Sequence, residues 1–128
     1  MMGVERILLV GLGGFVGAVL RYGLGGFVHR YLDAARFPYG TLTVNLAGCL
    51  AIGFLAGVAD ARGAFTPESR VFVFIGIIGA FTTFSTFSYE TMSFLRDGQV
   101  PAALVNVTLH VLLGLAAVWA GDALSRWM

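Results

Sequence analysis

Hydroxyl side chains and phenyl rings alternate over a short stretch of an otherwise apolar part of the chain. The hydroxyls are Thr82, Thr83, Ser85, Thr86 and Ser88, and the rings between them are Phe84 and Phe87. Hydroxyls donate hydrogen bonds to anions, and the edge of a phenyl ring is the positive part of its quadrupole. Conduction needs several weak sites rather than one strong charge. We therefore interpret the stretch as the lining of a pathway for a small anion. In the alternative, the rings face lipid or the core and the hydroxyls bond to their own helix.

The same stretch is where a membrane helix is most easily interrupted. Gly79 has no side chain, and Thr82 and Thr83 can bond to backbone groups, so local unwinding is feasible there. Carbonyl groups of unwound backbone near the middle of a membrane form a cation site. Two chains that cross at this point would bring two sets of carbonyls together. We expect a monovalent hard cation there, held structurally rather than conducted.

The rest of the chain has the composition of a membrane protein. It has 128 residues, a mean hydropathy of +0.86 and 12% charged residues, whereas globular proteins contain about 25%. Four apolar windows, at about 6–28, 40–59, 70–94 and 101–123, reach the roughly 20 residues that a span requires. The first window has no convincing cleavage site, so we interpret it as a retained span. The sequence predicts an all-α integral membrane protein of one four-span domain, with the third helix broken.

Arginines are divided almost equally between the two ends of such a bundle. One end would hold Arg6, Arg62, Arg70 and Arg126, and the other would hold Arg30, Arg36, Arg96 and, at the end of the first span, Arg21. The positive-inside rule therefore has almost no bias on which to act. We expect insertion in both orientations and pairing of opposite copies as an antiparallel, dual-topology homodimer. Alternatively, folding selects one orientation. The net charge of +1 gives no reason to expect a nucleic-acid partner.

Two further spans carry polar stripes at helical spacing. Thr41, Asn45 and Cys49 share one face of the second span, and Asn106 and His110 share one face of the fourth. Asn45 offers two N–H donors for an anion, although asparagine also acts as a hydrogen-bonding bridge between helices. His110 either lines the pathway or is a buried polar group with a partner.

The first span contains the small-residue motif Gly13-x-x-x-Gly17, which predicts a face where another helix packs closely. Arg21 lies four residues further on that face. It either attracts anions at a vestibule or extends to the membrane surface. Two distant histidines and one cysteine form no metal cluster of the usual nitrogen and sulfur type. We find no nucleophile paired with a base, so an enzyme is not expected.

These motifs together resemble those of the bacterial Fluc/CrcB fluoride channels. The resemblance rests on Gly79-x-x-Thr82-Thr83-Phe84-Ser85-Thr86-Phe87-Ser88-x-Glu90, on Gly40-Thr41-x-x-x-Asn45 and on the glycine-rich first span that ends in Arg21. It implies a homodimer in the bacterial inner membrane, with two antiparallel pores and a central structural sodium ion. The sodium would be bound by the backbone carbonyls of Gly79 and Thr82. The resemblance also places Asn45, Phe84 and Phe87 in the pore, Arg21 in the vestibule and Glu90 as the acid of the third span.

The sequence departs from that family at two places. The glycine pair often found at the break is Gly79-Ala80 here, and the fourth span carries Asn106 and His110 where relatives often have hydroxyls. The residues that we expect to line the pore and bind fluoride are Thr41, Asn45, Phe84, Ser85, Thr86, Phe87, Asn106 and His110.

The expected function is passive export of fluoride, which lowers its concentration in the cytoplasm. An alternative is a small dual-topology, four-span exporter of cations or drugs. Such an exporter needs a carboxylate within the membrane, but the first span has only Glu5 at its start and Glu90 lies towards the end of the third. A third possibility is a subunit that assembles with other proteins and transports nothing.

Overall fold

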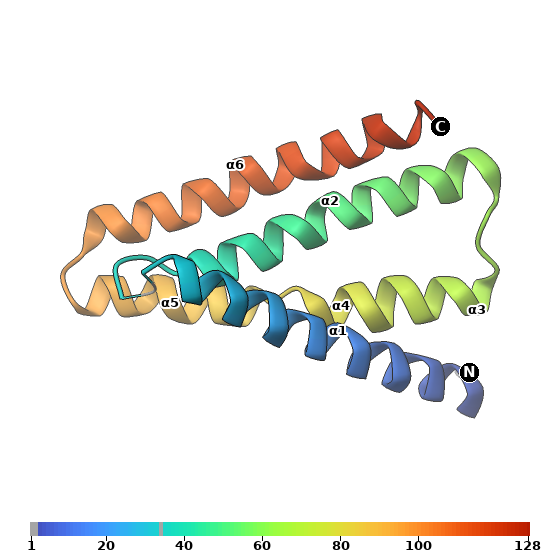
Figure 1. Cartoon of the computed structure of the whole chain (residues 1–128), viewed down its shortest axis with the longest axis horizontal. Coiled ribbons are helices and arrows are strands. Elements are labelled where there is room, and N and C mark those ends of the chain that lie inside the picture. The colour runs from blue at the N-terminus through green and yellow to red at the C-terminus, as the bar shows by residue number, and fades with distance from the viewer. Residues whose placement is uncertain (1–2, 34) are drawn as a thin grey trace.

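The computed structural model describes residues 3–33 and 35–128 and shows four long helical segments (Figure 1). The first two are α1 (Val4–Tyr31) and α2 (Tyr39–Arg62), and the last is α6 (Val100–Ser125). The third comprises α3 (Pro67–Arg70), the π-helix η1 (Val71–Ile78), α4 (Gly79–Phe81) and α5 (Phe84–Arg96). The described residues contain no strand. All four segments are long and apolar enough to cross a membrane, as the hydropathy pattern predicted, and the chain is a multi-pass membrane protein.

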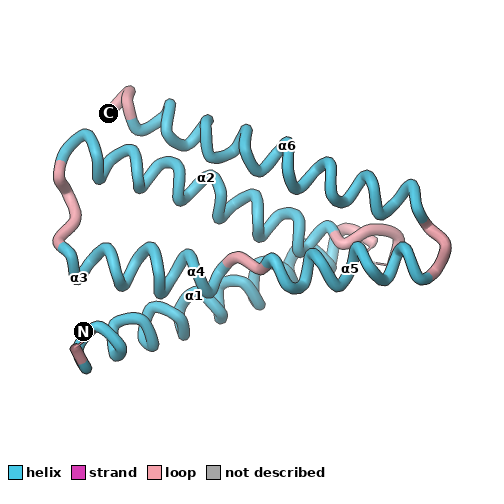
Figure 2. The backbone as a smooth tube through the Cα atoms, turned by 180° about the vertical axis from the view of Figure 1, so that it is seen from behind, coloured by secondary structure: helices cyan, strands magenta, loops and turns pink. Residues whose placement is uncertain are grey.

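The segments run alternately in opposite directions. Both termini and the connection between α2 and α3 lie at one end of the bundle, and the other two connections lie at the opposite end (Figures 1 and 2). The longest packing interface is between α2 and α6, while α1 packs on η1 and α4. The arginines are therefore distributed between the ends as the sequence predicted, except for Arg21, which lies inside α1 and ten residues before the helix ends at Tyr31.

Glycines allow the closest approaches between helices. A Cβ atom added at Gly13 would lie 2.9 Å from the Cα of Gly76, and one at Gly17 would overlap the carbonyl oxygen of Ile77. The prediction that Gly13 and Gly17 mark a helix–helix face is therefore confirmed, and the facing surface is the backbone of η1. Gly53 and Gly121 bring α2 and α6 together in the same way, because a Cβ at either would overlap the other helix's backbone.

The π-helix in the third span was not predicted. Its geometry is seen at its end, where the N–H of Gly79 donates to the carbonyl of Phe74, five residues earlier. The residues of η1 are apolar or glycine, and such a run is equally compatible with an ordinary α-helix. The sequence therefore carries no signal for the wider turn.

The third span is broken at two consecutive threonines. Thr82 (φ −89°, ψ 157°) and Thr83 (φ −147°, ψ 107°) have extended backbone between α4 and α5. Gly79 keeps helical geometry, with φ −59° and ψ −39°. The predicted interruption is present, and it lies at the threonines rather than at the glycine three residues before them.

Candidate functional site

Asn45 of α2 binds both backbone groups of Thr83 at the break. Its Oδ1 accepts from the N–H of Thr83 at 2.8 Å, and its Nδ2 donates to the carbonyl oxygen of Thr83 at 3.1 Å. An unpaired backbone group in the membrane costs several kcal/mol, on the order of the transfer cost of an amide. The side-chain amide of Asn45 therefore stabilises the extended backbone by replacing hydrogen bonds that a continuous helix would make.

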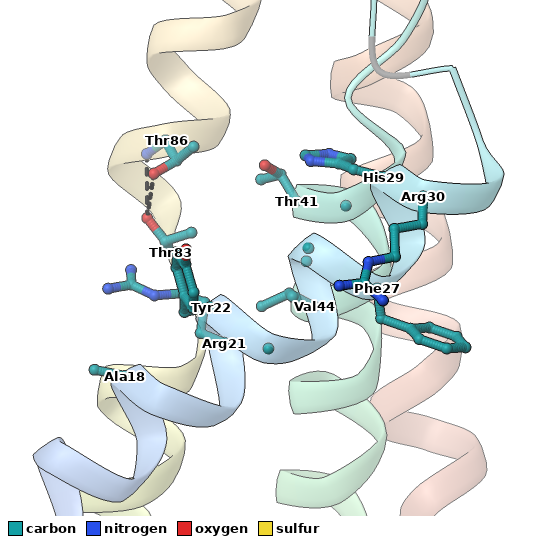
Figure 3. A pocket seen from close by; sticks show the side chains of 14 residues that line it. Ala18, Arg21, Tyr22, Phe27, His29, Arg30, Thr41, Val44, Thr83 and Thr86 are labelled. Carbon is teal, nitrogen blue, oxygen red and sulfur yellow. Dashed lines mark hydrogen bonds between the residues drawn. The ribbon is translucent and has the colours of Figure 1, made fainter.

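Thr83 in turn caps the next helix. Its Oγ1 accepts from the N–H of Thr86 at 3.2 Å, and its hydroxyl donates to Oγ1 of Thr86 at 3.0 Å (Figure 3). A threonine at the N-cap position accepts such a bond and stabilises a helix by about 1 kcal/mol. The extended conformation of Thr83 and the start of α5 at Phe84 thus follow from the same side chain.

The N–H groups of Thr83 and Thr86 bond to side chains, so two backbone carbonyls lose the donors that a helix would give them. In a continuous α-helix, Thr83 would donate to Gly79 and Thr86 would donate to Thr82. Here Thr83 donates to Asn45, and Thr86 donates to the side chain of Thr83. Gly79 and Thr82 are the residues that the resemblance implies as sodium ligands, and oxygen is the donor that a hard cation prefers. Within 3–33 and 35–128, no cluster of three or more His, Cys, Asp or Glu side chains could hold a metal.

A cavity of about 380 Å³ opens beside the break, and we call it the phenyl cavity. Its lining includes four predicted pore residues, Asn45, Phe84, Phe87 and His110. The centroids of the two phenyl rings are 5.5 Å apart, and their planes are inclined by 59°. Phe84 is 79% exposed, whereas Phe87 is only 9% exposed. Phe84 is therefore accessible from outside the chain, while Phe87 is enclosed by it.

A second cavity of about 770 Å³ lies between α1, α2 and α5, and we call it the arginine cavity (Figure 3). It is lined by two predicted pore residues, Thr41 and Thr86, and by the predicted vestibule residue Arg21. His29 and Arg30 add further basic side chains. Thr83 lines both cavities. The break in the third span therefore borders both cavities.

Glu90 interacts with a predicted pore residue of α2. The hydroxyl of Thr41 donates to its Oε1 at 2.6 Å, and its Oε2 is buried without a hydrogen-bond partner among the described residues. The short bond to a carboxylate is of the stronger, charge-assisted kind if Glu90 is ionised. It connects α2 to α5 one turn beyond Phe87.

Thr91 of α5 links the site to the fourth span, and it was not among the residues predicted from the sequence. Oγ1 of Thr91 donates to the carbonyl of Phe87 at 2.8 Å and accepts from Nδ2 of Asn106 at 3.0 Å. The available signal was its position four residues after Phe87, where a threonine hydroxyl reaches the preceding turn. Asn106 has no exposed surface and lines neither cavity.

The hydroxyls of the third span have different roles. Thr82 donates to the carbonyl of its own helix at Ile78, at 3.2 Å, so the alternative interpretation applies to this residue. Thr86 faces the arginine cavity. Ser85 is exposed, and its Oγ lies 3.3 Å from that of Thr83, although it lines neither cavity. The predicted lining is therefore divided between the two cavities, except for Ser85 and Asn106, which line neither.

Comparison with known proteins shows one consistent set of relatives. A protein of Methylobacillus flagellatus named "Fluoride-specific ion channel FluC" is 45% identical over 94% of this chain and 94% of its own length. Proteins of the same name from Nitratidesulfovibrio vulgaris and Flavobacterium psychrophilum are 44% and 38% identical, each over 96% of this chain and 98% of the relative. These relatives match the chain along almost its whole length. The model of the family described as "CrcB-like protein, Camphor Resistance (CrcB)" matches residues 8–122, and the chain belongs to this family.

Proposed function

We propose that the protein is a channel in the bacterial plasma membrane through which fluoride leaves the cytoplasm passively. The observation that carries this proposal is the pair of rings, Phe84 and Phe87, beside the break in the third span. The names of the relatives support fluoride as the ion. The membrane potential, negative inside, favours exit of an anion by about 2.3 kcal/mol per charge for each 100 mV.

The charge distribution supports an anion pathway. Among the described residues that line the phenyl cavity, none is Asp, Glu, Lys or Arg. Ring edges and the unused N–H of the Asn45 amide can replace part of the hydration shell of fluoride without binding it tightly. The arginine cavity precedes this region and has Arg21 and Arg30 in its wall. It would raise the local concentration of anions at the mouth of the pathway.

We further propose that a structural sodium ion is bound at the break by the carbonyl oxygens of Gly79 and Thr82. These carbonyls lack their helical donors, because the N–H groups of Thr83 and Thr86 bond elsewhere. A sodium ion would neutralise the partial negative charge of these oxygens and hold the extended backbone in place. Two carbonyls are fewer than the six ligands that a hard cation commonly takes, so a second copy of the chain would complete the site.

The proposed assembly is an antiparallel homodimer with one pathway on each side. Phe84 is 79% exposed in the single chain. This supports a dimer, because a ring that lines a pathway must be covered on its other side, and a second copy could cover it. The near-equal numbers of arginines at the two ends permit both orientations in one membrane.

The variant Phe84→Ile tests the pathway directly. It keeps a large apolar side chain but removes the positive ring edge, so fluoride efflux from proteoliposomes should fall by at least about tenfold, as expected when more than about 1.4 kcal/mol of stabilisation is lost. Phe15→Ile is the matched control, since Phe15 is also highly exposed, at 71%, and lies on α1 away from both cavities. Equal efflux from the two variants would remove Phe84 from the pathway.

A further inference from the structure

Four residues of α5 and α6 form a closed loop of contacts that begins and ends at Phe87. The carbonyl of Phe87 accepts from Thr91, and Oγ1 of Thr91 accepts from the side chain of Asn106 at 3.0 Å. The carbonyl of Asn106 is 3.0 Å from Nδ1 of His110, and the imidazole ring lies against the ring of Phe87 with centroids 4.2 Å apart. The loop begins at the backbone of Phe87 and ends at its side chain.

The hydrogen bond to Asn106 determines how His110 is protonated when it is neutral. A backbone carbonyl can only accept, so Nδ1 of His110 must carry the proton in this bond. Nε2 then carries a lone pair, and it is buried without a partner among the described residues. A lone pair repels an anion instead of donating to it. Neutral His110 is therefore poorly suited to bind fluoride itself, although it lines the phenyl cavity.

The loop is well suited to fix the orientation of the Phe87 ring. Tilted contact between aromatic rings contributes about 0.5–1.5 kcal/mol beyond simple burial, and the planes of His110 and Phe87 are inclined by 35°. His110 is itself held by its bond to Asn106, and Asn106 is completely buried. The direction of the Phe87 ring edge therefore depends on residues that never reach the cavity, of which Thr91 is the clearest example.

We propose that His110 is a positioning residue, which acts with Asn106 and Thr91 to hold the ring of Phe87 in the orientation that the anion pathway requires. This inference rests on the proposed fluoride channel, because it assigns Phe87 to the pathway. It gives the two polar residues of the fourth span a role that does not require contact with the ion.

Thr91→Val is the main test, because it has nearly the same shape and removes only the hydroxyl of the loop. Fluoride efflux should fall between about two-fold and ten-fold, the range that corresponds to losing one or two hydrogen bonds that position a group. Thr108→Val is the matched control, since Thr108 is an exposed threonine on α6 outside both cavities. Unchanged efflux in Thr91→Val would overturn the proposal.

Two substitutions of His110 separate positioning from direct contact with the ion. Phenylalanine keeps a ring against Phe87 but cannot donate a hydrogen bond, whereas glutamine donates but has no ring. Positioning predicts faster efflux in His110→Phe than in His110→Gln. The reverse order would show that a hydrogen-bond donor matters more than a ring at this position, and it would contradict the proposal.

A measurement without transport makes the result independent of the proposed function. Replacing Phe87 alone with 4-fluorophenylalanine gives a ¹⁹F resonance that reports the surroundings of the ring. One narrow line is expected in the otherwise unchanged protein and in Thr108→Val, and a shifted or broadened line in Thr91→Val. Identical spectra would refute the positioning role, even if the protein conducts fluoride. Absence of efflux with these spectral changes would refute only the channel.

Discussion

At the scale of single residues, Asn45 shows how one side chain can permit an interrupted helix in a membrane. Its amide pairs with both the N–H and the carbonyl of Thr83, so the extended residue keeps the bonds that lipid cannot provide. Only one of the two Nδ2 hydrogens is used by that carbonyl. The remaining one can serve the phenyl cavity, which Asn45 also lines.

Asn45→Asp should abolish fluoride efflux while the size of the assembly stays the same. The aspartate retains the acceptor for Thr83 but places an oxygen where Nδ2 donates, and it introduces a negative charge into an anion pathway. We expect a loss of about 1–3 kcal/mol in the free energy of unfolding, measured by thermal unfolding in detergent beside the efflux assay. Thr43→Val, two residues away on α2, should leave both quantities near those of the unchanged protein. Normal efflux from Asn45→Asp would exclude Asn45 from the pathway.

The residue types of the site could be predicted, but their partners could not. Asn45 was selected from the sequence for its donors, whereas its bond as an acceptor depends on how α2 lies against the break. Thr91 was not predicted as a site residue, because a threonine that bonds to its own helix is ordinary in a membrane span. The ionic roles of Gly79, Thr82 and Arg21 remain predictions. The carbonyls of Gly79 and Thr82 lack their helical donors, and Arg21 lines the arginine cavity, which is consistent with those roles.

At the scale of elements, helix packing depends on glycines whose added Cβ would meet backbone. The four spans and the break follow from hydropathy and from the paired threonines, because both signals are local. The π-helix η1 could not be predicted, since its residues fit an α-helix equally well. The contact of Gly13 with η1 could be predicted only as a face, without its partner.

Gly13→Ala and Gly11→Ala form a matched pair on α1. Alanine is favoured over glycine inside a helix by about 1 kcal/mol, so both substitutions would stabilise an isolated α1. At Gly13 the added methyl would lie 2.9 Å from Gly76, whereas at Gly11 there is no atom within 4 Å among those the structure describes. Gly13→Ala should therefore lower the free energy of unfolding by about 1–3 kcal/mol, and Gly11→Ala should not lower it. Equal unfolding temperatures in detergent would contradict the close packing of α1 on η1.

At the scale of the whole molecule, the arrangement of the ends determines what the charges can do. Both termini and the connection between α2 and α3 share one end (Figure 2), and the arginines other than Arg21 are divided between the two ends. A single chain also leaves Phe84 largely exposed. The antiparallel homodimer that the sequence predicts stays a prediction, because it depends on surfaces that lipid or a second copy can equally cover.

Single cysteines at the two ends test dual topology. In a background with Cys49 replaced by serine, Ala64→Cys and Gln99→Cys place thiols in exposed positions of the α2–α3 and α5–α6 connections. A maleimide that cannot cross membranes should label each variant in part when it is added to intact cells. Its reaction should become complete once the membrane is opened. Labelling of only one variant from outside would show a single orientation and would contradict the antiparallel dimer.

Efflux from liposomes that contain the purified protein tests whether the protein conducts fluoride. Vesicles are loaded with fluoride or with chloride, a potassium ionophore balances the charge, and release is followed with electrodes selective for each anion. We expect rapid release of fluoride, little release of chloride, and slower fluoride release when sodium is replaced by a large organic cation. Vesicles that retain fluoride as well as protein-free vesicles do would show that the protein is not a fluoride channel.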